Sequence, residues 1–302
     1  MKRQSLRLVS VVLTLCVVTF VSANVAPAKV RSSMIVTTDW LAKHLHDPSL
    51  VLLHVGDKKE FDAAHIPGAQ FIQNADISTR GQNLILELPP LEQLKAAFEK
   101  FGVADNSRIV IYFGKDWVTP TSRVYFTLDY LGLGDRASIL DGGMPAWIAE
   151  NRSVTTEVIS VKPGNFTPHP NAKLVVDANW VSANLNKPGV AILDARDAKF
   201  YTGESAGNMP RAGHIPSAKS IPFGSVVEES NKFKSEEVLR QVFTTAGVKP
   251  KDSVTTYCHI GQQASLLYFV AKYLGYDAHL YDGSFQDWSN RKDLPVEKST
   301  SQ

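Results

Sequence analysis

The sequence has very little cysteine and no apolar run long enough to cross a membrane. Its 302 residues include 2 cysteines, Cys16 and Cys258, which cannot form the disulfide framework typical of small secreted domains. The main apolar run, residues 8–21, is shorter than the ~20 residues of a spanning helix. The histidines and cysteines show no metal-ligand spacing such as C-x2-C or H-E-x-x-H. We therefore expect no metal and no external cofactor.

The N-terminus has the three parts of a secretory signal. A basic start, MKRQSLR, precedes the apolar run, and the small residues SANVAPA follow it. The alternative, a membrane anchor, is disfavoured by the short run and by the absence of basic residues directly after it. We predict that residues 1–23 are a signal peptide and that the mature protein is periplasmic or otherwise exported, without a membrane anchor. Cys16 leaves with the peptide, so Cys258 remains as an unpaired thiol.

The charge balance gives no sign of a nucleic-acid or membrane partner. The formal net charge is +2 and falls to −1 when Lys2, Arg3 and Arg7 are removed with the signal. No basic excess remains to bind an anionic polymer or surface. Apolar residues make up 44% of the chain, enough for a substantial core, and the length suggests about two domains.

An internal repeat is the strongest organisational signal. Residues 37–61 align without gaps on residues 177–201. The His-Ile-Pro turn at 65–67 returns at 214–216, so the second copy contains about nine additional residues before it. The alignment pairs Trp40 with Trp180, Leu45 with Leu185, Pro48 with Pro188 and Asp57 with Asp197. We predict an N-terminal domain over 33–152, a linker over 153–173 and a C-terminal domain over 174–296.

Within each copy, short apolar strands alternate with helices. The segments VLLHV and RIVIYF of the first copy correspond to AILDA and SVTTYC of the second, and an amphipathic helix separates the strands of each pair. This order predicts an α/β fold: two tandem domains, each a parallel sheet with helices on both faces. Ligands of such sheets gather at the carboxyl ends of the strands.

Cys258 lies at such a carboxyl end, between the strand SVTTY and the helix QQASLLYFVAKYLG. Inward-turned backbone N–H groups and the positive helix end would stabilise a thiolate there and lower its pKa. The alternative is a buried, inert cysteine that acts only as a small hydrophobe. Phe113 occupies the aligned position in the first copy. The fold thus does not require a cysteine, and we predict that only the second copy is active.

The motifs together resemble the tandem rhodaneses, which are thiosulfate or 3-mercaptopyruvate sulfurtransferases. The resemblance rests on AHIPGA and GHIPSA, on LDAR, on CHIGQQAS, and on the endings DGG…W and DGS…W. It implies an inactive N-terminal domain, a catalytic C-terminal domain and a persulfide on Cys258. By position, the loop that binds the substrate would contain His259, Ile260, Gly261, Gln262 and Gln263, closing near Ala264 and Ser265.

The two residues after the cysteine depart from both family patterns. Thiosulfate enzymes of the vertebrate kind have basic residues there, and mercaptopyruvate enzymes have glycine followed by serine or threonine; this chain has His259 and Ile260. Positive charge for the substrate would then come from a protonated His259 or from Arg211 in the additional segment. Arg196 would contact substrate or form a buried ion pair.

We therefore predict a monomeric sulfurtransferase that moves sulfur from thiosulfate, a small anionic donor, to cyanide or a thiol. The alternatives are a 3-mercaptopyruvate sulfurtransferase and a non-catalytic sulfur carrier or thiol sensor. A phosphatase-like cysteine loop would need an arginine six positions after the cysteine, and this position is Ala264. His65 and His214 recur in both copies, so we predict structural roles for them.

Overall fold

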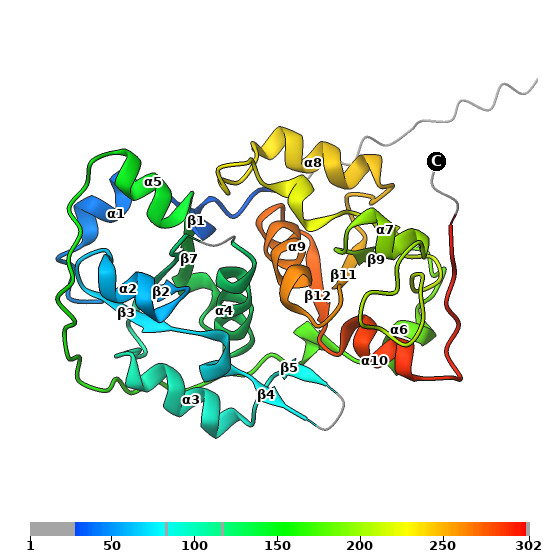
Figure 1. Ribbon diagram of the computed structural model, residues 1–302, viewed down its shortest axis with the longest axis horizontal. Helices are drawn as coiled ribbons and strands as arrows, with labels where there is room; N and C mark the ends of the chain where they lie inside the picture. The colour runs from blue at the N-terminus through cyan, green and yellow to red at the C-terminus, as the bar shows by residue number, and fades with distance from the viewer. Residues whose placement is uncertain (1–27, 82–83, 116–117, 300–302) are drawn as a thin grey trace, which may run out of the picture.

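The computed structural model describes residues 28–81, 84–115 and 118–299. The predicted signal peptide, with Cys16, lies outside these residues. Within the described part of the chain, no helix combines the length and apolarity needed to span a bilayer. Two α/β units lie side by side (Figure 1). The segment between them, residues 156–171, contains no helix and no strand.

The N-terminal unit is built on a five-stranded parallel sheet of order β1-β7-β6-β2-β3. Its strands are β1 (Ile35–Val36), β2 (Leu50–Val55), β3 (Ala69–Ile72), β6 (Arg108–Phe113) and β7 (Ala137–Leu140). Its helices are α1 (Thr38–His44), α2 (Lys58–Ala63), α3 (Leu91–Lys100), α4 (Thr119–Tyr130) and α5 (Gly143–Ala149). A separate antiparallel hairpin pairs β4 (Thr79–Arg80) with β5 (Ile85–Glu87).

The C-terminal unit repeats this sheet with the order β10-β9-β11-β12-β8. Its strands are β8 (Val175–Val176), β9 (Val190–Asp194), β10 (Lys219–Ser220), β11 (Ser253–Tyr257) and β12 (Asp277–Tyr281). Its helices are α6 (Ala178–Ala183), α7 (Ala198–Thr202), α8 (Glu236–Thr245), α9 (Gln262–Tyr273) and α10 (Ser284–Asn290). Short 3-10 turns occur at 32–34, 74–77, 134–136, 172–174 and 223–226.

The predicted parallel sheets covered on both faces are confirmed. In β6, every residue from Ile109 to Phe113 is buried, as expected when helices cover both faces. The sequence did not predict β1, β3, β8 and β10, because strands of two to four residues are too short to show a period. They add one strand at each edge of the two sheets.

The repeated residues have the same local roles in both copies. The side chains of Thr37 and Asp177 cap α1 and α6 by accepting hydrogen bonds from the backbone of Trp40 and Trp180. The buried His65 stacks on Phe61 and hydrogen-bonds the carbonyl oxygen of the same residue. His214 does the same with Tyr201. These contacts support the structural role predicted for the two histidines.

A single apolar core extends through the boundary between the two units. It includes buried residues from the inner face of each sheet and from α3, α4, α8 and α9. Helices α4 and α9 pack against each other at its centre, where the rings of Tyr125 and Phe269 lie 4.7 Å apart and those of Phe126 and Tyr268 lie 5.0 Å apart, both edge to face. Such aromatic pairs add stabilisation beyond the area that they bury. The two sheets thus lie on either side of a shared helical centre.

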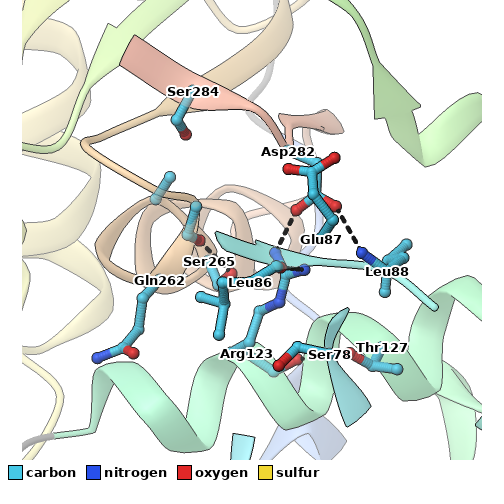
Figure 2. Close-up of polar contacts among 12 residues, drawn as sticks. Ser78, Leu86, Glu87, Leu88, Arg123, Thr127, Gln262, Ser265, Asp282 and Ser284 are labelled. Carbon is cyan, nitrogen blue, oxygen red and sulfur yellow. Dashed lines mark hydrogen bonds and ion pairs between the residues drawn. The ribbon is translucent and has the colours of Figure 1, made fainter. Parts of the chain in front are cut away.

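Arg123 of α4 carries a buried positive charge within this interface. Its side chain is 0% exposed and forms an ion pair with Asp282, just after β12. It also donates a hydrogen bond of 2.5 Å to the carbonyl oxygen of Leu86 in β5. Asp282 in turn accepts a hydrogen bond from the backbone of Leu88 (Figure 2). One arginine thus joins α4, the β4–β5 hairpin and the C-terminal sheet.

We expect Arg123→Met to destabilise the protein by about 3–5 kcal/mol, because it leaves Asp282 buried without its cation. Lys58→Met is the control. Lys58 pairs with Asp62 on the surface, where both side chains are about half exposed, and such pairs contribute less than about 1 kcal/mol. Urea unfolding measures both. Equal losses in the two variants would show that the buried pair does not stabilise the interface.

Candidate active site

The structure places Cys258 directly after β11, in the turn that leads into α9. Its side chain is 1% exposed and belongs to the shared core between the two units. Gly261 closes the turn with a φ of 89° and serves as the N-cap of α9. A side chain is disfavoured in this left-handed conformation. Residues 258–261 therefore form a tight loop at the carboxyl end of the sheet, as predicted.

The loop directs backbone N–H groups at the sulfur. Hydrogen bonds from the amides of Ile260, Gly261, Gln263 and Ala264 all lower the pKa of Cys258. Four donors around one Sγ form a binding site for an anion that needs no charged side chain. An inert cysteine in an apolar core has no need of such donors. The geometry supports the predicted anion cradle.

The predicted direction of the thiol pKa is wrong, however. Burial raises the pKa of Cys258 above its ordinary value and outweighs the four amide hydrogen bonds that lower it. The loop and the helix end alone favour a lowered pKa of the thiol, and the prediction did not include burial. Charge is costly in a sulfur withdrawn from water between two units. The resting side chain is therefore a protonated thiol. The amides of the cradle stabilise its anionic form, but burial opposes ionisation more strongly.

His259 does not supply a positive charge at neutral pH. Burial and then the neighbouring Arg196 lower the pKa of His259 to about 4. Its ring packs edge to face against Phe200 of α7, with the centroids 4.5 Å apart. A neutral imidazole favours the backbone account of the cradle over one that depends on His259.

Arg196 forms the buried ion pair that the sequence left as one of two possibilities. The Arg196 side chain is 1% exposed, and its Nη2 lies 2.6 Å from Asp194 Oδ2 at the end of β9. Tyr257 donates to the same Asp194 oxygen at 2.7 Å. Arg196 is close enough to Cys258 for their charges to interact. It is thus a positive charge near the cysteine loop, held in place by Asp194.

Arg211 lies in a different environment from the one we predicted. Its guanidinium donates to the carbonyl oxygens of four residues at the end of α10 and beyond it: Trp288, Ser289, Arg291 and Leu294. Orphan carbonyls at a helix end attract cations in this way. The side chain therefore terminates α10, and its hydrogen bonds do not favour the substrate contact that we predicted.

Two sides of the molecule hold the cysteine loop. On one side, Ser284 at the start of α10 accepts a hydrogen bond from the Cys258 amide, and the amides of Phe285 and Gln286 donate to the carbonyl oxygens of Cys258 and His259. On the other side, the Gln262 side chain reaches the N-terminal unit, where it accepts from Asn74 and donates to Thr119. The first residue of α9 thus contacts the other unit and does not point at the sulfur.

In the first copy, a phenylalanine ring fills the place that corresponds to Cys258. Phe113 is 1% exposed, and its ring lies against Gly143, where a Cβ would approach ring atoms to 2.8 Å. The residue that aligns with Gly143 is Ser284, the partner of the Cys258 amide. The smaller cysteine leaves room for this serine. The sequence signal for Ser284 was the serine of DGS, where the first copy has DGG. The prediction from the sequence did not include this residue in the site.

A hollow of about 410 Å³ opens beside the loop. Its walls are His259 and Ile260 of the loop, Phe200, residues 207–209 of the additional segment, Gln286, and Ile85 of the N-terminal hairpin. None of these residues is an acid, a lysine or an arginine. Within the part of the chain that the structure describes, no group of histidines, cysteines and acids could hold a metal ion.

Comparison with known proteins identifies the family. The family model for the rhodanese-like domain matches residues 37–150 and again residues 177–291. The chain belongs to the rhodanese family. The second rhodanese-like domain contains Cys258, and the first contains Phe113 at the aligned position.

Curated relatives match both rhodanese domains over most of their length. The sulfur carrier protein TtuD of Thermus thermophilus is 31% identical and covers 88% of this chain and 96% of its own. The thiosulfate sulfurtransferase of Azotobacter vinelandii is 29% identical, covering 85% and 94%. The thiosulfate/3-mercaptopyruvate sulfurtransferase 1 of Arabidopsis thaliana is 28% identical, covering 89% and 79%.

Solved structures show the same fold. The anaerobic ergothioneine biosynthesis enzyme of Chlorobium limicola superposes with a TM-score of 0.78 at 20% identity and covers 89% of this chain and 71% of its own. YnjE has a TM-score of 0.77 at 20% identity, covering 89% and 69%. At 20% identity, these two structures show a shared fold and nothing more about this chain.

We expect iodoacetamide to alkylate Cys258 with an apparent pKa above the free value of ~8.5, because burial is the dominant effect. His259→Ala should shift this pKa by less than about one unit, since the histidine is already neutral at these pH values. His259→Gln, which keeps a polar side chain, should behave in the same way. The measurement is the alkylation rate between pH 5 and 10. A change of two units or more in His259→Ala would make the imidazole the main partner of the thiolate.

Proposed function

We propose that this protein is a sulfurtransferase that moves a sulfane sulfur from thiosulfate to cyanide or a thiol through a persulfide on Cys258. The main support is the cradle, in which four backbone N–H groups are directed at the sulfur of a tightly held loop. The rhodanese relatives named as sulfurtransferases give independent support. The chain needs no external cofactor for this chemistry, since both steps are displacements at sulfur.

The reaction proceeds by two displacements. The Cys258 thiol first loses its proton to water. The thiolate then attacks the outer sulfur of thiosulfate, the sulfur–sulfur bond of the donor breaks, and sulfite leaves with the electron pair. The anionic outer sulfur of the persulfide then lies among the backbone N–H groups. Cyanide or a thiolate attacks this outer sulfur, the bond to Sγ breaks, and the Cys258 thiolate is restored. Charge and sulfur balance in each step.

The hollow beside the loop suggests where the acceptor approaches. It is lined by uncharged side chains and is connected to the cysteine through His259 and Ile260. A volume of about 410 Å³ is in the range of sites for organic ligands and exceeds the needs of cyanide. This space favours an organic thiol as the natural acceptor, with cyanide as a small substitute.

We expect Cys258→Ser to abolish thiocyanate formation from thiosulfate and cyanide, because a serine hydroxyl cannot form a persulfide. Phe113→Ala should keep sulfur transfer and lose about 3–5 kcal/mol of stability, since the fully buried ring leaves a cavity. Steady-state assays and urea unfolding measure the two effects. Substantial turnover in Cys258→Ser would assign the nucleophile elsewhere. A wild type that loads with sulfur once, without turnover, would instead be a sulfur carrier.

We also propose that the protein is exported and acts as a monomer. The N-terminal sequence supports export through its basic start, apolar run and small residues. The contacts around the cysteine loop support the monomer, because the chain's own N-terminal unit supplies Asn74 and Thr119 to Gln262. No second copy is needed to complete the loop.

N-terminal sequencing of the protein from the envelope fraction should give a first residue after Ala23 or Ala28, because a cleaved signal removes both the basic start and Cys16. The matched control is a variant in which Leu13 and Val17 are replaced by arginine, since charges in the apolar run prevent export. It should remain in the cytoplasm with Met1 intact. An envelope protein that begins with Met1 would contradict cleavage.

A further inference from the structure

An anionic sulfur donor must approach a sulfur around which the nearby cations are already engaged. Arg196 is paired with Asp194, Arg123 is paired with Asp282, and Arg211 is bound to carbonyl oxygens of the C-terminal unit. His259 is neutral because of its lowered pKa. The backbone amides of the cradle serve the sulfur, so the anionic group at the other end of the donor still lacks a partner for the charge that it takes out of water.

A second hollow adjoins the cysteine loop, between Ile260 and the N-terminal unit. Its volume is about 270 Å³, and its walls include Ser78, Thr79, Arg80, Ile85 and Ile260. The amide of Ile260 belongs to the cradle of Cys258, and the same residue lines this hollow. Arg80 is the only charged residue in the lining. Ile260 thus belongs both to the anion cradle and to the hollow that Arg80 lines.

Arg80 is available for a ligand. It is exposed, and among the described residues it has neither an ion-pair partner nor a hydrogen-bonded partner for its side chain. The pairing of β4 with β5 is irregular between Thr79 and Arg80. Such bulges commonly redirect a side chain beside an active site.

The hairpin that carries Arg80 is fixed against the catalytic unit. The Ile85 amide donates to Gln286 of α10 at 3.0 Å, and the Leu88 amide donates to Asp282 at 3.1 Å. Arg123 binds the carbonyl oxygen of Leu86 between them. Leu86 itself has a φ of 69°, a conformation that costs energy for leucine. These contacts hold β5, and with it the paired β4, against α10 and the turn after β12.

We propose that Arg80, in the domain without a cysteine, binds the anionic group of the sulfur donor and draws it to Cys258. The proposal rests on the sulfurtransferase activity proposed above and identifies the donor by its chemistry: a small sulfur compound with a sulfonate-like or carboxylate group. Thiosulfate and 3-mercaptopyruvate share this chemistry. The inactive copy thus contributes a substrate-binding residue to the active site of the other.

The first test uses alkylation, which needs no sulfur donor and therefore reports on Arg80 even if neither donor is a substrate. The rates at Cys258 for anionic iodoacetate and neutral iodoacetamide are compared by mass spectrometry of the cysteine peptide. In Arg80→Gln, the iodoacetate to iodoacetamide ratio should fall about fivefold, as expected for one exposed ion contact. Arg80→Lys should restore most of it. High salt should reduce the ratio in the wild type.

The control is Lys100→Gln, which removes an exposed positive charge at the end of α3, away from both hollows. Its ratio should equal that of the wild type. A ratio that is unchanged in Arg80→Gln, or that falls equally in Lys100→Gln, overturns the proposal.

The second test uses turnover with thiosulfate and with 3-mercaptopyruvate. Arg80→Gln should raise the KM for the donor about fivefold and change kcat little, because the contact precedes the chemical step. A rise with either donor supports the proposal and shows which donor the hollow receives. An unchanged KM for both overturns it. Absence of turnover in the wild type would refute the proposed function and leave the alkylation result to decide on Arg80.

Discussion

The arrangement of the site depends on a buried ion pair between the two rhodanese domains. Arg123 belongs to the N-terminal domain and Asp282 to the C-terminal one, and both are almost fully withdrawn from water. A Cβ on Gly261, the last residue of the cysteine loop, would lie 3.1 Å from the Arg123 guanidinium. The loop is thus pressed against a side chain of the other domain. Since a lone buried charge is costly, the two domains are held in one relative position, and this position determines which hollows exist beside Cys258.

Comparison of the two domains shows that the surroundings of Cys258 differ from the equivalent place in the first copy by several side chains. The second copy has Asp194 and Arg196 as an ion pair, and the first copy has His54 and Gly56 in their places. His54 is buried, and neither of its ring nitrogens has a hydrogen-bond partner within the described residues. Burial, and next His65, lower its pKa to about 4. Phe113 and Gly143 replace Cys258 and Ser284. The first domain therefore has neither the cysteine nor the ion-paired arginine of the second.

The fold and the position of Cys258 in it were predictable from the sequence, because both follow from local patterns. Apolar runs, helix caps and the repeat identify the strands and helices, and the order strand, loop, helix places Cys258 at the carboxyl end of the sheet. Asp282, which pairs with Arg123, and the carbonyl groups that bind Arg211 are more than 75 residues away in the chain, and no period or motif reports such contacts. The direction of the Cys258 pKa was predicted wrongly for the same reason. Its burial comes from tertiary packing, which a local pattern does not contain.

The burial of Cys258 also determines which molecules can react with it. A sulfur that is 1% exposed, at the bottom of a loop between two domains, cannot meet the surface thiol of a folded protein without rearrangement. Disulfide formation with such proteins requires direct contact between sulfur atoms. The site would therefore act as a filter by size: small sulfur compounds, or a thiol on a slender flexible arm, would enter, whereas bulky thiols would be excluded. In an oxidising compartment the same filter would keep a lone cysteine from becoming cross-linked to its neighbours.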